Sequence, residues 1–394
     1  MRVAMLCNFP LHTLENSPIR FLQGQHATSW LVDLPEAFSK IQGLEMHWIT
    51  LSDQVEKEMA FPVDGAFFHV LPTSKKGRAA SFFVCDRRRI KECLNKVRPD
   101  VVHGWGTEDV YALAAVTSGY PHLISMQGIL SALILKSWMH PREYFQALLE
   151  IWCLRKAQLV TTESNWGAAT VRKRRGSQPI EIVEYGVRNN FFTTRWSPEK
   201  EKPYAIFIGS IVARKGIEDL IEAFRNLKKE GYRLKVIGRA KTKYLSIIQK
   251  RAEGTVDWLG EQPAEVVQSE MSRAWCLALP TRADTSPNVV KEARVIGLPV
   301  ITTRNGGQAS YVRDGEDGYF VECGDIKGLV QKLKIVLGSL ATTEKLGKVG
   351  QQRYRNLFTA TQTAYAFGDI YIKLLGPKTQ REQDSLLQTR KKNS

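Results

Sequence analysis

The amino-acid sequence predicts an α/β protein with two doubly wound parallel sheets, each in its own domain. Short apolar runs, typical of buried strands, alternate with amphipathic helical segments along most of the chain. The length of 394 residues is enough for two domains that each bury a full core. A polar, proline-bounded segment, residues 191–203, separates the two series and is interpreted as the interdomain linker.

Residues 1–190 form the predicted N-terminal domain. Helical patterns cover Trp30–Lys40, Arg88–Val97 and Glu143–Lys156. The loop after the first strand contains Gly24, and ligands of open α/β sheets bind outside the carboxyl ends of strands, so this loop can reach one. An ordinary loop is the alternative. The predicted strands are Val3–Cys7, Met46–Leu51, Phe67–Leu71, Val101–His103, Leu123–Met126, Leu159–Thr162 and Ile180–Val183.

Residues 204–360 form the predicted C-terminal domain. The helix Ile217–Lys228 places its apolar residues on one face. A further helix over 361–375 is expected to pack back on the N-terminal domain, and the basic, polar tail 376–394 is expected to be disordered. The predicted strands are Tyr204–Ile208, Leu234–Ile237, Thr255–Leu259, Cys276–Leu279, Val300–Thr302 and Tyr319–Val321.

The composition narrows the class of partner and the expected location. Apolar residues make up 43% and charged residues 24%, which is ordinary for a globular protein, whereas a net charge of +16 implies anionic partners. Those partners could be nucleotide phosphates, acidic lipids or nucleic acid. The six cysteines contain no CxxC, so we expect neither disulfides nor a zinc site, and a cytoplasmic location. No signal peptide or transmembrane run is recognisable.

The stretch from Trp275 to Ile301 carries the main candidate site. An apolar run that reads as a buried strand is followed by a polar loop and a helix. Ser286 is a suitable N-cap and Pro287 suits the first helical position. The amides of Asn288 and Val289 are then free donors at the positive end of a helix dipole, which favours a phosphate group.

Two carboxylates flank this helix end, because Glu292 stands eight positions after Asp284. Such a pair would repel phosphate alone, but ionised carboxylates are strong acceptors for hydroxyl groups. A nucleotide sugar combines both chemistries, with a diphosphate between a ribose and a hexose. The alternative is a surface loop with a capped helix and two solvated acids.

A second phosphate-binding element lies between the first strand and helix of the C-terminal domain. Its loop runs from Gly209 to Gly216 and contains the adjacent cations Arg214 and Lys215, which suit a diphosphate. A solvated basic loop is the alternative. Because the two elements follow the first and fourth strands of one sheet, we expect them to share one crevice.

These motifs resemble those of the retaining nucleotide-sugar glycosyltransferases of family four, of the bacterial polysaccharide and glycoconjugate type, over Met1 to Leu375. The resemblance implies the GT-B fold, in which two Rossmann-like domains face each other across a cleft. The carboxylate pair and the Gly209 to Gly216 loop match the family most specifically. Further matches are Gly306-Gly307, Asp314-Gly315 with Gly318, the turn at Val187, and the segments DVVHGW and ISMQGI.

The resemblance also implies roles in a donor site. Glu292 would accept hydrogen bonds from the donor ribose, and Asp284 would contact hydroxyls of the transferred sugar. Ser286 and the amides of Asn288 and Val289 would help to bind the donor. Three further residues match donor-contacting positions of the family: Gly24, Gly209 and Gln127.

Arg214 and Lys215 would neutralise the diphosphate leaving group, since the resemblance implies catalysis without a metal and the chain contains no Asp-x-Asp. The chain departs from the family pattern at four positions. These are Asp284 for Glu, Ser210 for Arg, Gln127 for His and Ser310 for Glu, and they leave the donor sugar undefined.

The acceptor side is expected in the N-terminal domain, where His103 and Trp105 follow a strand and face the presumed cleft. A saccharide or lipid-linked acceptor fits this interpretation, and the basic cluster Arg172–Arg175 could contact an anionic membrane. A structural histidine and a solvated basic patch are the alternatives. A nucleotide-sugar epimerase or a nucleic-acid-binding protein also remains open, although no dedicated acid–base pair or nucleic-acid-binding signature is found.

Overall fold

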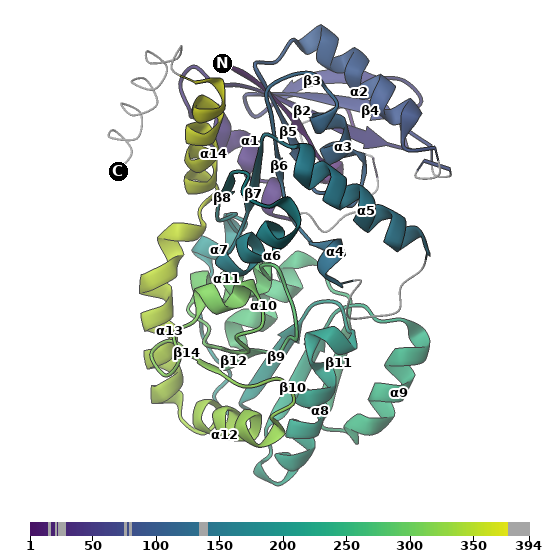
Figure 1. Ribbon diagram of the computed structural model, residues 1–394. Coiled ribbons are helices and arrows are strands. Elements are labelled where there is room, and N and C mark those ends of the chain that lie inside the picture. Colours follow the sequence, from purple (N-terminus) through teal and green to yellow (C-terminus); the bar gives the residue numbers. More distant parts are fainter. Residues whose placement is uncertain are drawn as a thin grey trace. The chain divides into compact units, whose positions relative to one another are not determined.

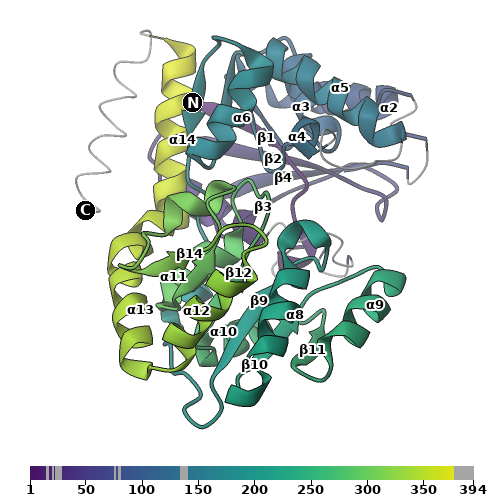
Figure 2. The ribbon, with the colours of Figure 1, turned by 60° about the horizontal axis from the view of Figure 1, so that its bottom comes forward.

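The chain forms two compact units in a computed structural model that describes residues 1–14, 17–19, 22, 29–74, 77–78, 81–133 and 141–376. Unit 1 comprises Met1–Arg188 together with Ala360–Ser394, and unit 2 comprises Asn189–Thr359. Each unit contains a parallel sheet with helices packed on it (Figures 1 and 2). None of the described helices has the length and apolar character needed to cross a membrane.

Unit 1 contains an eight-stranded sheet with the order β3-β4-β2-β1-β5-β6-β7-β8. All neighbouring strands are parallel except β3, which runs antiparallel to β4 and was absent from the sequence-based prediction. The central strands are almost fully buried, as expected where helices cover both faces. The strands are β1 Arg2–Leu6, β2 Glu45–Ser52, β3 Met59–Val63, β4 Ala66–Pro72, β5 Val101–Trp105, β6 His122–Ser125, β7 Leu159–Thr162 and β8 Ile180–Ile182.

The helices of unit 1 enclose two apolar clusters. One cluster lies under α2, α3, α5 and α6, and the other under α1 and α14. The helices are α1 Leu34–Ser39, α2 Val84–Val97, α3 Val110–Val116, α4 Leu130–Leu133, α5 Pro141–Lys156, α6 Asn165–Arg175 and α14 Ala360–Leu375, with short 3-10 helices at Leu11–Thr13 and Ser29–Leu31.

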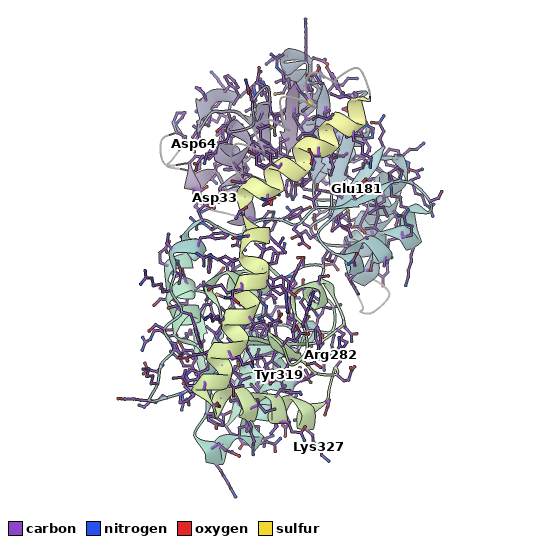
Figure 3. All side chains as sticks on the ribbon, turned by 90° about the vertical axis from the view of Figure 1, so that its left-hand side faces the viewer. Asp33, Asp64, Glu181, Arg282, Tyr319 and Lys327 are labelled. Atoms are coloured by element: carbon purple, nitrogen blue, oxygen red, sulfur yellow. The ribbon has the colours of Figure 1, made fainter. Side chains whose placement is uncertain are left out.

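Helix α14 returns from the end of the chain to the N-terminal sheet. It packs on α1, and Lys373 forms an ion pair with Glu181 of β8, which Figure 3 labels beside the helix. The side chains of Phe367 and Tyr371 are fully buried in the cluster under α1. The predicted C-terminal helix therefore completes the core of unit 1. The expected tail lies outside the described residues, apart from Gly376.

Unit 2 contains a six-stranded, all-parallel sheet with the order β11-β10-β9-β12-β13-β14. The order reverses between β9 and β12, so the loops that follow these two strands meet at one edge of the sheet. The strands are β9 Tyr204–Ile208, β10 Arg233–Ile237, β11 Val256–Gly260, β12 Cys276–Leu279, β13 Val300–Thr302 and β14 Gly318–Phe320. All six coincide closely with predicted strands.

The helices of unit 2 form one connected set. Helix α8 contacts α9 and α12, α12 contacts α13, and α13 contacts α11 (Figure 2). Helix α11 also contacts α7. The helices are α7 Asn190–Thr193, α8 Ile217–Asn226, α9 Thr242–Ala252, α10 Ala264–Arg273, α11 Asn288–Ile296, α12 Ile326–Leu337 and α13 Leu340–Tyr354. Short 3-10 helices lie at Ala213–Lys215, Lys228–Glu230, Gly307–Tyr311 and Arg355–Phe358.

The segment interpreted as a linker, residues 191–203, is instead part of unit 2. The Ser197 amide donates to Ser272 O over 2.8 Å, and the Trp196 indole donates to Ala274 O over 2.8 Å. Two residues that the polar composition assigned to a free linker thus hydrogen-bond to the backbone around the end of α10. The boundaries between the units fall at Arg188–Asn189 and Thr359–Ala360.

Candidate functional site

The loop after β9 is shaped by two glycines. Gly209 follows the strand with a φ of 142°, and its amide donates to Ile237 O over 3.0 Å. Gly216 has a φ of 78°, and a Cβ atom there would lie 2.1 Å from Pro280 O. Only glycine allows this conformation and this close approach, so the β9 loop lies directly against the loop after β12.

Backbone and side-chain hydrogen bonds join the two loops. The Arg282 amide donates to Arg214 O over 2.8 Å, and the Arg214 guanidinium donates to Ala283 O. Arg282, labelled in Figure 3, also forms an ion pair with Asp219 at 2.9 Å. The two elements singled out in the sequence therefore lie at one place, the point where the strand order reverses.

At the centre of this place Lys215 forms an ion pair with Asp284. The two side chains are only 14% and 15% exposed, so the pair is much better shielded from water than a surface ion pair. A predicted phosphate-binding cation and a predicted sugar-binding carboxylate are thus direct partners. The sequence predicts that the two residues bind different parts of the ligand, and it does not predict this pairing.

A third loop, after β13, fixes the backbone of Asp284. The Gly307 amide donates to Asp284 O over 2.8 Å. A Cβ atom on Gly306 would lie 2.5 Å from the same carbonyl oxygen and 2.9 Å from the Asp284 amide nitrogen. The Gly306-Gly307 motif therefore allows the loop to approach closely enough to position the carboxylate.

The start of α11 differs from the prediction by one residue. Pro287 is the N-cap, with φ −71° and ψ 113°, and Asn288 is the first helical residue. Ser286 makes no capping bond, because its hydroxyl is hydrogen-bonded to the Tyr311 hydroxyl at 2.9 Å. The Val290 amide donates to Pro287 O over 3.0 Å.

The amides of Asn288 and Val289 have no partner among the hydrogen bonds of the described residues, as expected at a helix N-terminus. The side-chain oxygen of Asn288 is also buried without a partner. An unpaired buried polar atom is uncommon in a folded protein, and this one is an acceptor, so it needs a donor such as a ligand hydroxyl. The two free amides, in contrast, make this helix end suited to bind an anion.

Glu292 lies in the second turn of α11 and is partly exposed. Two fully buried cations of the same helix, Lys291 and Arg294, hold its inner face against the core. The Lys291 ammonium lies 5.5 Å from the centre of the Tyr311 ring, and Arg294 donates to Tyr311 O over 2.8 Å and to Asp317 O over 2.7 Å. Burial lowers the pKa of Arg294 to about 10. These contacts fix the helix that carries Glu292.

The two residues expected on the acceptor side, His103 and Trp105, are core residues. His103 is fully buried, with Nδ1 2.8 Å from the Tyr371 hydroxyl and Nε2 2.6 Å from the Ser125 hydroxyl. Trp105 is 2% exposed and its ring lies 5.2 Å from that of His103. Burial lowers the pKa of His103 to about 3. The expectation was wrong because α14 covers the strand that carries both residues.

The remaining predicted residues of unit 1 are Gln127 and Gly24. Gln127 follows β6 and is partly exposed, and its side-chain oxygen lies 3.5 Å from where a Cβ of Gly106 would be. Gln127 thus lies at the carboxyl end of β6, and its role in donor binding stays a prediction. Gly24 lies outside the described residues.

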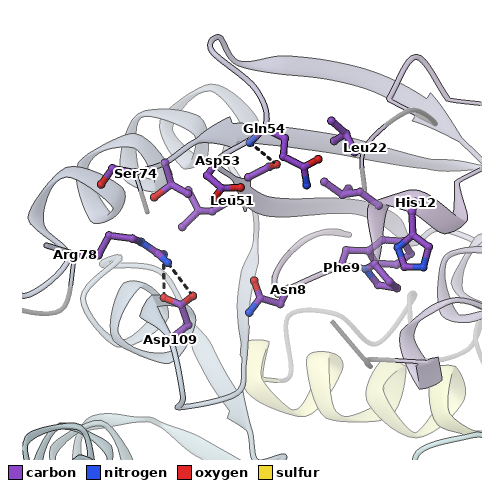
Figure 4. A pocket seen from close by; sticks show the side chains of 14 residues that line it. Asn8, Phe9, His12, Leu22, Leu51, Asp53, Gln54, Ser74, Arg78 and Asp109 are labelled. Atoms are coloured by element: carbon purple, nitrogen blue, oxygen red, sulfur yellow. Dashed lines mark hydrogen bonds and ion pairs between the residues drawn. The ribbon is translucent and has the colours of Figure 1, made fainter. Parts of the chain in front are cut away.

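Unit 1 contains a pocket of about 210 Å³ at the carboxyl ends of β1, β2 and β4 (Figure 4). Its lining combines polar side chains, including Asn8, Asp53 and Gln54, with the apolar Phe9. In Figure 4 the Arg78 guanidinium forms two bonds with Asp109, at 2.9 and 3.2 Å. This pocket is not predictable from the sequence, because its lining residues come from separate segments between Asn8 and Asp109.

Among the residues that the structure describes, one group has the composition and spacing to hold a metal ion. Glu58, His69 and Cys93 of unit 1 bring their ligand atoms within 4.8 Å of one another. Glu58 forms an ion pair with Lys96 at 2.7 Å, and His69 Nε2 lies 3.0 Å from His47 Nδ1. Glu58 and His69 are thus already engaged with protein partners.

The cluster Arg172–Arg175, expected as a basic surface patch, is only half exposed. Arg175 is 4% exposed and donates to three backbone carbonyls, of Leu154, Gln158 and Pro179. Arg174 is partly buried and hydrogen-bonded to Ser131. Arg172 and Lys173 are the two exposed members, so the cluster by itself offers two cations rather than four.

Two family models match consecutive parts of the chain. The model for "Glycosyltransferase Family 4" matches residues 28–190, and the model for "Glycosyl transferases group 1" matches residues 190–353. Together they span most of both units. They also meet within two residues of the boundary at Arg188–Asn189.

Individual relatives are similar at low identity. An uncharacterised glycosyltransferase of Methanocaldococcus jannaschii is 23% identical over 79% of this chain and 86% of its own length. The capsular polysaccharide biosynthesis glycosyltransferase CapM of Staphylococcus aureus is 28% identical over 47% of this chain and 50% of its own length. The chain therefore spans about half the length of CapM.

Solved structures are similar over nearly the whole chain. The sucrose-phosphate synthase of Thermosynechococcus elongatus has a TM-score of 0.77 and 17% identity, covering 95% of this chain and 98% of its own. Anabaena HepE, solved in complex with UDP and glucose, has a TM-score of 0.70 and 14% identity, with 94% and 99% covered. At these identities the likeness concerns the fold.

Proposed function

Because this chain is a GT-B glycosyltransferase of the family-four type that uses a nucleotide-sugar donor, we propose that it is a retaining, metal-independent hexosyltransferase acting on a saccharide or lipid-linked acceptor. The donor would bind in unit 2, between the Gly209–Gly216 loop and the start of α11. The observation that carries this proposal is the shielded ion pair of Lys215 and Asp284 at the reversal of the strand order.

The charges of this site fit a sugar diphosphate. Lys215 and Asp284 together are neutral, and Arg214 beside them adds one positive charge. The free amides of Asn288 and Val289 add the positive end of the α11 dipole. A diphosphate placed against these groups would interact with Lys215 and Arg214, and would leave the Asp284 carboxylate to accept hydrogen bonds from the sugar hydroxyls.

Glu292 would bind the ribose of the same donor. It lies on the helix whose N-terminus would hold a phosphate, and the buried contacts of Arg294 fix that helix. A carboxylate is a strong acceptor for a pair of neighbouring hydroxyls. UDP-glucose is a reasonable first donor to test, because the structurally similar HepE was solved with UDP-glucose.

Metal independence rests on the positive charge that the protein itself supplies. With the donor bound as proposed, Arg214, Lys215 and the N-terminus of α11 would lie against the leaving nucleotide, and preorganised donors of this kind are strong catalysts. Transfer should therefore continue in excess chelator. Loss of turnover that returns only with added Mg²⁺ or Mn²⁺ would contradict the proposal.

Retention of the anomeric configuration follows from the roles proposed for the two carboxylates. With Asp284 and Glu292 engaged by hydroxyl groups, neither is placed to attack the anomeric carbon. The leaving phosphate oxygen would then accept the proton of the acceptor hydroxyl, while the new C–O bond forms on the face from which the phosphate departs. An α-linked nucleotide sugar should give an α-glycoside. The coupling constant of the new anomeric proton, measured by NMR, tests this.

The acceptor would bind in the pocket of unit 1. Its polar lining over an apolar ring suits a saccharide, since sugars present hydroxyls at their edges and C–H groups on their faces. Arg78 is already paired with Asp86 at 2.6 Å and with Asp109 at 2.9 Å, so the pocket favours hydroxyl groups over an extra anionic group. This assignment replaces the buried His103 and Trp105.

The decisive experiment is a donor panel read by thermal shift and by release of free nucleotide. A bound nucleotide sugar should raise the melting temperature by mass action, and transfer or slow hydrolysis should release the nucleoside diphosphate. An epimerase would return a nucleotide sugar with altered configuration and no free nucleotide. Neither that alternative nor nucleic-acid binding gains support from the family matches.

A further inference from the structure

Helix α5, labelled in Figure 1, carries a stripe of exposed apolar and aromatic side chains. Tyr144, Leu148 and Trp152 are 42%, 68% and 41% exposed. Their spacing of four residues places them one above another on the same face of the helix. A surface helix normally directs polar side chains outward, so this face is unusual for a helix that only covers a core.

The opposite face of α5 is already used for packing. Ala147 and Leu154 are buried, and Glu150 is 1% exposed and accepts hydrogen bonds from the Thr107 hydroxyl at 2.8 Å and the Ser131 amide at 2.9 Å. The orientation of the helix is therefore fixed from the inside. The exposed stripe is held in place by these contacts and does not result from a loosely attached helix.

The exposed face is basic where it is not apolar. Of the described side chains of α5, five are exposed: the three of the stripe together with Arg155 and Lys156. Helix α6 packs beside α5 and adds the exposed Arg172 and Lys173. No carboxylate on α5 is exposed, since Glu143 is only partly so and Glu150 is buried.

These cations have no carboxylate partner among the residues that the structure describes. Arg155 donates to the backbone oxygen of Arg174 over 3.1 Å, and Arg172 donates to that of Gly176 over 3.2 Å. Within the described part of the chain, no ion pair with a carboxylate is formed by these two residues or by Lys156 and Lys173. An apolar stripe thus ends in four cations that pair with none of the described carboxylates.

We propose that this face, the α5 surface formed by Tyr144, Leu148, Trp152, Arg155 and Lys156 with Arg172 and Lys173 of α6, docks on an anionic lipid bilayer. Tyrosine and tryptophan rings are suited to the boundary between headgroups and acyl chains, and leucine to the acyl region just below. Lysine and arginine at the rim attract acidic headgroups.

Charge favours a bilayer over a second copy of the chain as the occupant. The chain carries a net charge of +16, and pairing two copies through this face would bring two clusters of cations together. An anionic bilayer offers the complementary charge over an area as large as the surface. The inference goes beyond the proposed transfer reaction, because docking is measured without any donor or acceptor.

Vesicle flotation of the full chain tests the proposal. The wild type should float with phosphatidylcholine vesicles that contain about 30% phosphatidylglycerol, and salt should weaken this binding. The double variant Leu148→Ser/Trp152→Ser should lower the partition coefficient at least tenfold. The variant Lys156→Gln/Lys173→Gln should lower it by roughly tenfold to thirtyfold on anionic vesicles only, as expected for about two surface cations.

A matched control removes two exposed apolar side chains elsewhere. Ile247 and Leu357 of unit 2 are 45% and 51% exposed, and Ile247→Ser/Leu357→Ser should bind vesicles like the wild type. Melting temperatures of all variants establish that they are folded, and nucleotide release from the donor should be unchanged by the α5 substitutions. That readout separates failure of docking from failure of the proposed function.

Two outcomes would overturn the proposal. The first is wild-type vesicle binding by the Leu148→Ser/Trp152→Ser variant, which would place the membrane contact elsewhere or show that there is none. The second is a dimer of the wild type in sedimentation experiments that dissociates in the same variant, which would identify a second copy of the chain as the occupant of the α5 surface.

Discussion

Neutralising Asp284 should strengthen the binding of a nucleoside diphosphate while reducing sugar transfer. Asp284 pairs with Lys215 and thereby cancels a positive charge at the proposed diphosphate site. The substitution Asp284→Asn keeps the shape of the side chain and releases that charge. Lys215→Met does the reverse, since it leaves the carboxylate unpaired beside the phosphates. The two substitutions should therefore shift the affinity for UDP in opposite directions.

The magnitude follows from the burial of the pair. Side chains that are 14% and 15% exposed lie between a surface environment and a deep interior. At an effective dielectric constant of about 20, two unit charges about 4 Å apart interact by about 4 kcal/mol, and screening and rearrangement reduce the net effect. We expect about 1–2 kcal/mol for each substitution, which is a change of about fivefold to thirtyfold in the dissociation constant.

Calorimetric titration with UDP measures both effects, and the double variant should return close to the wild-type affinity. A matched control is Glu230→Gln. It also removes one negative charge, but at the amino ends of the strands, where Glu230 forms a 2.6 Å ion pair with Lys334. That control should leave the affinity for UDP unchanged. If both Lys215→Met and Asp284→Asn weaken UDP binding, the pair is structural and the charge argument fails.

Three further outcomes are expected. Glu292→Ala should weaken UDP binding by about 2–4 kcal/mol in calorimetry with an unchanged melting temperature, and retained affinity would remove Glu292 from the donor site. Arg294→Met should lower the free energy of unfolding in urea by about 3–5 kcal/mol, because Arg294 and Asp317 are both fully buried; a loss below about 1 kcal/mol would contradict this. Burial lowers the pKa of His103 to about 3 in the folded chain, whereas an unfolded histidine has a pKa of about 6.5. As the pH falls below about 6.5, the unfolded chain therefore takes up a proton on His103 that the folded chain does not, and the free energy of unfolding decreases. Between pH 7 and 5 the wild type should therefore lose about 2 kcal/mol more unfolding free energy than His103→Gln, and equal losses would show that His103 is protonated in the folded state.

The sheets and the convergence of the two loops could be predicted because they depend on local patterns. Buried parallel strands are recognisable as short apolar runs, and the carboxyl ends of neighbouring parallel strands meet at one edge. Gly209 and the Asp284 loop could thus be placed together from their positions after the first and fourth strands. The antiparallel edge strand Met59–Val63 was missed, since it contains Pro62 and is partly exposed.

The contacts that could not be predicted join residues far apart in the chain. His103 is buried because α14 supplies the Tyr371 hydroxyl from 268 positions away, although its place inside a fully buried strand was a signal that it belongs to the core. Ser286 does not cap α11, because its hydroxyl is hydrogen-bonded to the Tyr311 hydroxyl. The pairing of Lys215 with Asp284 likewise depends on side-chain packing that no spacing reveals.

The two carboxylates at the start of α11 should be separable by a single ligand. UDP contains the ribose proposed for Glu292 and the diphosphate proposed for Lys215, but it lacks the transferred sugar proposed for Asp284. Removing the Glu292 carboxylate therefore removes a favourable contact with the ribose of UDP. Neutralising Asp284 removes only its repulsion of the diphosphate. Opposite effects on UDP from two acids eight positions apart would be difficult to reconcile with general damage to the loop, because the Gly307 amide bonds to the backbone oxygen of Asp284 whichever side chain is present.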